Sequence, residues 1–164
     1  MKAAAKAKQE TNRWRVTMLL ADYAEAINGK LYIMGGGWSI TGPAPSQSAL
    51  AIKIEVPWND TNRRHELKVE LLDGDYNPVL VPTPAGNSAL VVTGAFEVGR
   101  PPGIIVGSPL DVPFAFNIGP IPLESERRYI WRLSIDGKTD ENWQVTFSTR
   151  PSGQQGPALR ASAD

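Results

Sequence analysis

The chain has 164 residues, a length that suits a single domain, and its seventeen basic and seventeen acidic side chains cancel at neutral pH. This balance gives no indication of binding to nucleic acid or to an acidic membrane surface. The absence of cysteine excludes disulfides and thiolate metal sites, and it favours the cytoplasm or a particle assembled there.

The two ends of the chain differ in composition from its middle. Residues 1–12 carry Lys2, Lys6 and Lys8 among alanines and polar residues, which predicts a basic arm that is either flexible or ordered by docking on a partner. Charges stand where a signal peptide needs apolar residues, and no apolar run approaches the roughly 18 residues of a membrane span. Residues 151–164 predict a polar tail, which leaves residues 13–150 as the folded domain.

Alternating apolar and polar side chains predict strands in the first part of this domain. Residues 14–20 form the first alternating run, whereas residues 21–27 are ambiguous because Ala and Glu favour helix. Asn28-Gly29 then predicts a two-residue type I′ turn before a returning strand at residues 31–34. The run Gly35-Gly36-Gly37 indicates a bulge or a close approach of backbones.

The middle of the chain alternates strand patterns with loops that are rich in proline and glycine. The strand at residues 50–56 has the clearest pattern, and residues 82–88 and 99–109 are predicted to be loops. The strands expected here are residues 50–56, 67–71, 79–81, 92–98 and 114–118.

The strongest pattern is a hairpin over residues 128–149. A polar turn that contains Asp136-Gly137 separates two runs of period two, which is the signature of a half-buried antiparallel sheet. The side chains that alternate onto one face are Tyr129, Trp131, Leu133 and Ile135, followed after the turn by Trp143, Val145 and Phe147.

These elements predict an all-β protein of eight or nine short strands. Regular strand spacing with turns between strands is typical of a sandwich or a barrel. We expect an antiparallel β-sandwich, because the strands vary in length and the two long loops could cross between sheets.

Two resemblances refine this prediction. Residues 123–133, with Tyr129 early in its strand and Trp131 two residues later, are similar to the E–F corner and F strand of immunoglobulin-like domains, without the usual cysteine. Over roughly residues 14–150 the chain also resembles a family of small uncharacterised proteins from bacterial and phage genomes. That resemblance implies a compact β domain with no established activity, and it is carried by motifs at residues 21–24, 29–31, 35–38, 54–58 and 131–137.

The sequence offers no catalytic set. His65 is the only histidine, and it shares strand parity with Leu67, which favours a position at the rim of the core over a role as catalytic base. Asp73, Asp75 and Asn77 match the opening of a calcium loop, but the rest of that pattern is missing and an Asp-Gly turn explains them. We therefore expect no enzyme, no cofactor and no metal site.

Exposed apolar residues are the remaining candidates for function. Trp58 follows a proline in a polar loop, where it either packs beneath the loop or forms a platform for a sugar or a protein. Ile104 and Ile105 lie in the loop at residues 99–109, which either buries them in its own domain or docks them on a neighbour. The candidate partner-binding residues are Lys2, Lys6, Lys8, Trp58, Ile104 and Ile105.

Together these features predict a non-enzymatic structural or interaction protein that attaches to a larger protein assembly. The phage resemblance makes a capsid-decorating or other virion accessory role the concrete version, located in the cytoplasm or in a virion assembled there. A homo-oligomer is compatible with this prediction. The alternative is a module that binds carbohydrate or a small ligand through Trp58 and the neighbouring loops.

Overall fold

The computed structural model of the chain describes residues 13–42 and 46–153, and these ranges consist largely of β-strands. They contain twelve strands and the 3₁₀ helix η1 (Trp58–Asp60), so the expectation of eight or nine strands is wrong. The additional strands are short. In chain order the strands are β1 (Arg15–Ala21), β2 (Tyr23–Ile27), β3 (Lys30–Met34), β4 (Ile40–Thr41), β5 (Ser48–Val56), β6 (Arg64–Asp73), β7 (Leu80–Thr83), β8 (Gly86–Ala89), β9 (Val91–Glu97), β10 (Leu110–Ile118), β11 (Arg128–Ile135) and β12 (Gln144–Thr149).

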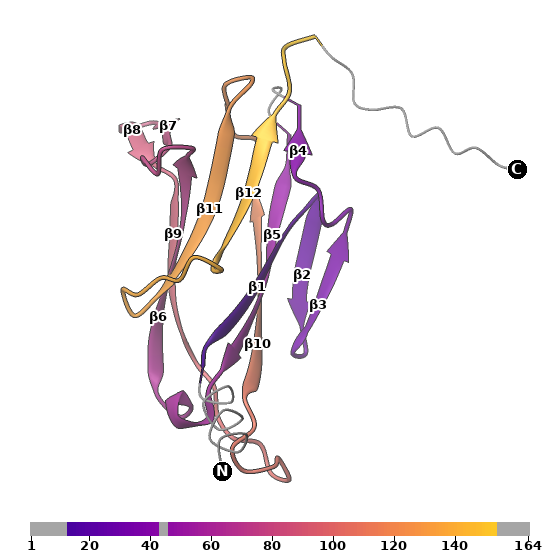
Figure 1. Cartoon of the computed structure of the whole chain (residues 1–164), viewed down its shortest axis with the longest axis vertical. Coiled ribbons are helices and arrows are strands. Elements are labelled where there is room, and N and C mark those ends of the chain that lie inside the picture. The colour runs from indigo at the N-terminus through magenta and orange to yellow at the C-terminus, as the bar shows by residue number, and fades with distance from the viewer. Residues whose placement is uncertain (1–12, 43–45, 154–164) are drawn as a thin grey trace, which may run out of the picture.

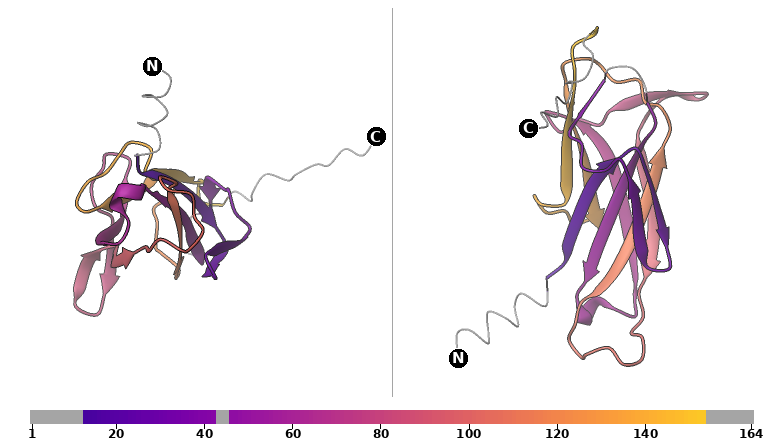
Figure 2. Two further views of the ribbon diagram at one scale, coloured as in Figure 1. Left: turned by 90° about the horizontal axis from the view of Figure 1, so that it is seen from below. Right: turned by 90° about the vertical axis from the view of Figure 1, so that its right-hand side faces the viewer.

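These strands form two larger sheets and two separate hairpins (Figure 1). One sheet has the order β1-β5-β10, and the other has the order β4-β12-β11-β6-β9. All neighbours are antiparallel except β4, which runs parallel to β12 through two residues. The two sheets lie in separate layers (Figure 2), an arrangement that is compatible with the expected β-sandwich.

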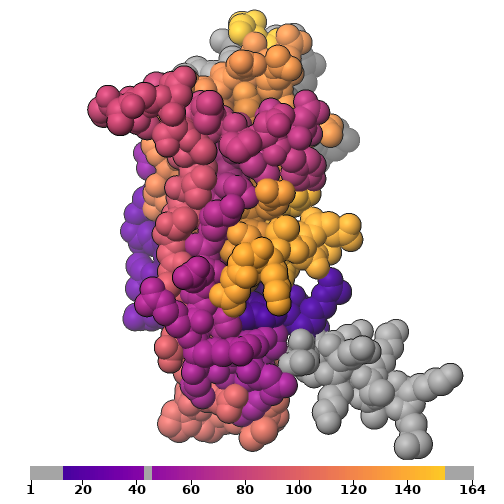
Figure 3. Space-filling view, turned by 90° about the vertical axis from the view of Figure 1, so that its left-hand side faces the viewer, coloured from indigo at the N-terminus to yellow at the C-terminus, as the bar shows by residue number. Residues whose placement is uncertain are grey.

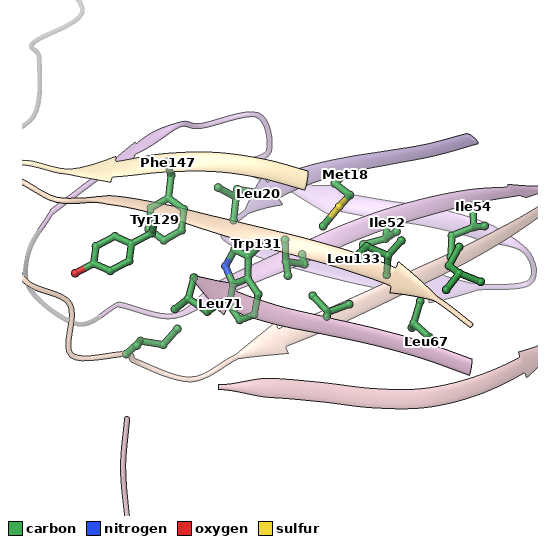
Figure 4. Close-up of a cluster of buried hydrophobic side chains, with 14 of the residues drawn as sticks. Met18, Leu20, Ile52, Ile54, Leu67, Leu71, Tyr129, Trp131, Leu133 and Phe147 are labelled. Carbon is green, nitrogen blue, oxygen red and sulfur yellow. The ribbon is translucent and has the colours of Figure 1, made fainter. Parts of the chain in front are cut away.

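Both sheets contribute alternate side chains to one hydrophobic core (Figure 4). Trp131 of β11 is 1% exposed and lies among residues of both layers. The predicted period of two is confirmed in β5 and β6. Their alternating apolar residues in this core are Leu50, Ile52, Ile54 and Val56 of β5 and Leu67, Val69 and Leu71 of β6. Burial of apolar surface on this scale is the main stabilising contribution to a fold of this kind.

The β2–β3 hairpin covers part of the outer face of the three-stranded sheet. Its turn is of the predicted type, since Asn28 and Gly29 have φ values of 50° and 74°. The ambiguous residues 21–27 include strand β2, in which Ala24 is fully buried. The small side chains let the hairpin pack closely on the sheet. This packing outweighs the helix preference of Ala and Glu. The residues in this second cluster are Ala21, Ala24, Ala49 and Ala51, with Leu31 and Ala115 packed against them.

The glycine run after β3 allows a close approach of backbones, as predicted. The amide of Gly37 donates to the carbonyl of Leu20 over 2.7 Å, and the amide of Asp22 donates to the carbonyl of Gly35 over 3.3 Å. A Cβ atom on Gly36 would lie 2.6 Å from the Cγ2 atom of Ile33. A Cβ atom on Gly35 would also meet the side chain of Asp22. Gly35 and Gly36 therefore have no room for a larger side chain without local rearrangement.

The prediction of a loop at residues 82–88 is wrong. Strands β7 and β8 pair there in a hairpin that projects from the body of the molecule (Figure 1). Most of its side chains are exposed, so the sequence has no apolar alternation to reveal it. The predicted hairpin at residues 128–149 is confirmed as β11 and β12, and Asp136 and Gly137 adopt φ values of 51° and 74° in its turn.

Candidate partner-binding surface

Trp58 is fixed at one end of the molecule by Arg100. Pro57 ends β5, and η1 begins at Trp58, whose side chain is half-buried. The Arg100 guanidinium lies 4.1 Å from the centre of the indole ring, in a cation–π contact. Its Nη2 atom donates to the Trp58 carbonyl over 2.7 Å, and its Nε atom donates to Oγ1 of Thr61 over 2.6 Å. These contacts join the loop at residues 99–109 to η1.

The same loop presents two large apolar side chains to solvent. Ile105 is 77% exposed and Val106 is 80% exposed, the largest fractions among the exposed large hydrophobic residues of the described ranges. Ile104 is only half-buried, and the amide of Ser108 donates to the carbonyl of Ile105 over 3.1 Å. We call Ile104, Ile105 and Val106 the apical loop tip; it lies at the end of the molecule where β9 leads into β10 (Figure 1).

Through Arg100, the structure links Trp58 to the loop that carries Ile104 and Ile105, which are three of the six candidate residues. Trp58 lies against Arg100, which is near the start of the loop that carries Ile104 and Ile105. Lys2, Lys6 and Lys8 lie outside the described residues. Arg100 is not among the predicted residues, and no local pattern indicates it, because 42 positions separate it from Trp58.

His65 is a buried residue at the rim of the core, as predicted. It is 2% exposed and packs edge-on against Trp14, with ring centres 4.9 Å apart. Its Nε2 atom lies 2.7 Å from the carbonyl oxygen of Asp60, and its Nδ1 atom lies 2.7 Å from Oδ2 of Asp136. Because a carbonyl oxygen only accepts, Nε2 must donate, and both ring nitrogens have protein partners. The imidazole therefore ties η1 to the turn after β11.

The carboxyl group of Asp136 completes this link. Its Oδ1 atom accepts from the amide of Glu66 over 2.8 Å while Oδ2 contacts His65. Burial alone would raise the pKa of Asp136, but the hydrogen bonds from His65 and from the Glu66 amide lower it below its ordinary value. The ionised carboxylate thus holds the ends of β6 and β11 together.

Asp73 caps a turn, which is the interpretation that the sequence favours over a calcium site. Its Oδ1 atom accepts from the amides of Asp75 and Asn77, each over 2.9 Å. The hydrogen bonds from Asn77 and Asp75 lower the pKa of Asp73, against a smaller opposing effect of burial. No cluster of three or more metal-binding side chains occurs in residues 13–42 and 46–153.

A shallow groove of about 660 Å³ crosses the outer face of the five-stranded sheet over β9, β6 and β11. Its floor includes the small residues Thr93, Gly94 and Ala95 of the edge strand β9. Its walls carry both signs of charge, and Glu70 pairs with Arg132 over 2.9 Å and with Lys68 over 3.1 Å. The charged lining residues are Arg64, Glu66, Lys68, Glu70 and Arg132.

Fold and surface together define an all-β protein with an exposed apolar loop at one end. Residues 16–147 match a family of unknown function, DUF6941, and the chain therefore belongs to that family. This match confirms the predicted membership of an uncharacterised family with no established activity. No curated protein matches the chain. In the part of the chain that the structure describes, no helix has the length and apolar character needed to cross a membrane.

Proposed function

We propose that this chain is a non-enzymatic interaction protein that attaches to a larger protein assembly through its apical loop tip. The observation that carries the proposal is the exposure of Ile105 and Val106 on a loop that Arg100 fastens to η1. Holding the loop against Trp58 lowers the conformational entropy that docking would otherwise cost. Exposed aliphatic side chains on a positioned loop are suited to an apolar pocket on a protein partner.

We also propose that the two sheets form an immunoglobulin-like sandwich. The strand orders β1-β5-β10 and β4-β12-β11-β6-β9 support it, as does the short parallel pairing of β4 with β12. The Tyr129 hydroxyl accepts from the Glu124 amide over 2.9 Å, as in the tyrosine corner of that fold. Trp131 occupies the position two residues later, where a cysteine is usual, and fills the core in place of a disulfide.

The concrete version of the proposal is a capsid-decorating or other virion accessory role, in a particle assembled in the cytoplasm. It rests on the resemblance to proteins from phage genomes. The apolar tip and the absence of cysteine are compatible with this role, and they suit any large intracellular assembly equally well.

The alternative, a carbohydrate-binding module, would use Trp58 as its stacking platform. The Arg100 guanidinium covers one face of that indole, so a sugar ring has to use the other face or displace the arginine. The structure gives this alternative no observation of its own, and a shift of tryptophan fluorescence on addition of a glycan panel would favour it.

Gradient sedimentation of a native lysate tests the proposal. We expect the wild-type chain to sediment with a large particle and the variant Ile105→Ser/Val106→Ser to stay near the top of the gradient. The control is Leu80→Ser, which removes an apolar side chain that is 60% exposed on the distant β7–β8 hairpin. The proposal is contradicted when the wild-type chain sediments as a free species, or when the double variant sediments with the particle as the wild type does.

A further inference from the structure

The imidazole of His65 lies between two hydrogen-bond acceptors. Its Nε2 atom is 2.7 Å from the carbonyl oxygen of Asp60, and its Nδ1 atom is 2.7 Å from Oδ2 of Asp136. The Asp136 side chain is 45% exposed and its other oxygen accepts from the Glu66 amide, two conditions that keep the carboxyl group ionised at neutral pH. Neither partner can then donate to the ring, so both ring nitrogens must donate. Only the doubly protonated, positively charged imidazolium does so.

The surroundings of this ring accommodate one positive charge. The rings that pack against it are uncharged: Trp14, with ring centres 4.9 Å apart, and Phe96 of β9, with ring centres 5.5 Å apart. The Asp60 carboxylate accepts from the Trp14 indole over 2.9 Å and pairs with Arg63. On β6 itself, the charged neighbours of the histidine point to the other face of the sheet. The carboxylates of Asp60 and Asp136 therefore exceed the Arg63 guanidinium by one negative charge, which the imidazolium balances.

Loss of one proton leaves the ring with a single hydrogen bond to donate. A hydrogen bond to an ionised carboxylate is stronger than one to a neutral carbonyl, so the remaining proton stays on Nδ1 and faces Asp136, while the other passes to solvent. The Nε2 lone pair then lies against the carbonyl oxygen of Asp60, and two acceptors 2.7 Å apart repel each other. The neutral ring therefore keeps its bond to the turn after β11 and releases η1.

The 3₁₀ helix η1 holds the base of the loop at residues 99–109. Asp60 is its last residue, and the carbonyl of Trp58, its first residue, accepts from Nη2 of Arg100 over 2.7 Å. Thr61 follows η1 and accepts from Nε of Arg100 over 2.6 Å. Figure 3 shows the turn after β11, in orange, against the start of β6, with the loop at the lower end of the molecule. A displacement of η1 therefore moves both groups that bind Arg100.

We propose that His65 is a pH-sensitive switch for the apical loop tip. The imidazolium holds η1 and, through Arg100, the loop, whereas the neutral ring with its proton on Nδ1 releases both. A loop that is held in place costs less conformational entropy on docking, so docking is favoured at the lower pH. This effect on docking rests on the proposed function, whereas the effect on η1 and the loop does not.

Nuclear magnetic resonance of the full chain tests the switch, because His65 is its only histidine. The ¹⁵N shifts of the ring distinguish the imidazolium from the two neutral tautomers. Between about pH 5 and about pH 9 we expect the imidazolium to give way to the Nδ1–H tautomer. The signals of the Thr61 amide and of the Arg100 Nε–H group should shift in the same transition. Hydrogen exchange of the Thr61 amide, relative to its intrinsic rate, should become faster on the order of tenfold.

Asp136→Asn separates the loss of the ring proton from the release of η1. The carboxamide oxygen can accept from the Glu66 amide while the NH₂ group donates to Nδ1 of the neutral ring. The ring then carries its proton on Nε2 and stays bonded to the Asp60 carbonyl. We expect the Nε2–H tautomer in this variant and an Arg100 signal that does not change with the ring. Asp73→Asn is the matched control, because it alters a carboxyl group at the far end of β6 and should behave as the wild type does.

Three results would overturn the switch. In the first, the neutral wild-type ring carries its proton on Nε2. In the second, the Thr61 and Arg100 signals stay constant while the ring changes. In the third, the Asp136→Asn variant releases η1 as the wild type does.

Gradient sedimentation on the acid and the alkaline side of the ring's transition tests the effect on docking. The wild type should sediment with the particle on the acid side and less on the alkaline side, whereas Asp136→Asn should sediment alike on both. Equal sedimentation of the wild type on both sides, with η1 released, would overturn the effect on docking. A wild type that stays free on both sides contradicts the proposed function, and the magnetic resonance result then still decides the switch.

Discussion

The hydroxyl group of Tyr129 supports the connection between β10 and β11 through one hydrogen bond. The side chain is almost buried, and its oxygen accepts from the Glu124 amide over 2.9 Å. Tyr129→Phe leaves that amide without its partner, and we expect the free energy of unfolding to fall by about 1 kcal/mol. Urea denaturation measures this change, and Tyr76→Phe at an exposed hydroxyl is the control that should have little effect. Equal losses in both variants would contradict a special role for Tyr129.

The carboxyl group of Asp136 makes stability depend on pH. Folding lowers the pKa of the Asp136 carboxyl group. The native chain therefore holds the carboxyl proton less tightly than the unfolded chain does. The stability that the carboxylate contributes is complete above its unfolded pKa, about 4, and is lost as the pH falls through the lower folded value.

Asp136→Asn removes the ionisable carboxyl group and keeps the turn, because Asn-Gly also favours a type I′ turn. The variant therefore isolates the pH dependence that this carboxyl group causes. Unfolding free energies from pH 7 down to pH 3 should fall less steeply for the variant than for the wild type. Parallel pH profiles would show that the link to His65 and Glu66 contributes no pH dependence.

Single residues show where prediction from the sequence ends. The positions of His65 and Trp131 could be predicted, because strand parity alone places a side chain on the core face. The contact of Arg100 with Trp58 could not, because it joins two loops whose approach depends on the packing of both sheets. The same limit applies to the link between His65 and Asp136, which are 71 positions apart.

At the scale of elements, the turn after β3 depends on glycine. Gly35 has a φ value of 60°, and a Cβ atom there would collide with the side chain of Asp22. Gly35→Ala should therefore lower the free energy of unfolding by roughly 1–2 kcal/mol. Thermal unfolding compares it with Gly119→Ala, where no atom lies within 4 Å and φ is ordinary. An unchanged melting temperature for Gly35→Ala would show that this segment adopts another conformation.

The predictability of each element follows from how many of its faces are buried. β5, β6 and β11 were found because one face of each enters the core and gives a period of two. β2 was ambiguous because it contacts the body through small alanines, which carry no strand preference of their own. β8 was missed because all four of its residues are exposed.

At the scale of the molecule, one core joins the two sheets, and Trp131 lies within it. Trp131→Ala should cost roughly 3–5 kcal/mol, which is a large part of the stability of a typical domain. The variant should lose the single cooperative urea transition of the wild type or shift it to much lower urea concentration. A small shift would mean that the two layers are stabilised mainly by contacts away from the indole.

The surface that carries the proposed function lies at one end of the body. The apical loop tip lies beyond the ends of β9 and β10. The class of fold could be predicted from the sequence, but the position of this surface could not, because exposure depends on how the strands pair. The apolar residues of the loop were identified as candidates, and the structure adds that Ile105 and Val106 are the ones that project.

Site-specific photo-crosslinking tests the central claim most directly. A photoreactive residue is placed at position 105 in the full chain, and a control carries it at position 88 on the exposed hairpin. After sedimentation and irradiation, we predict that position 105 crosslinks to a protein of the particle and that position 88 does not. Particle-bound chain that crosslinks from position 88 and not from position 105 would contradict docking through the apical loop tip.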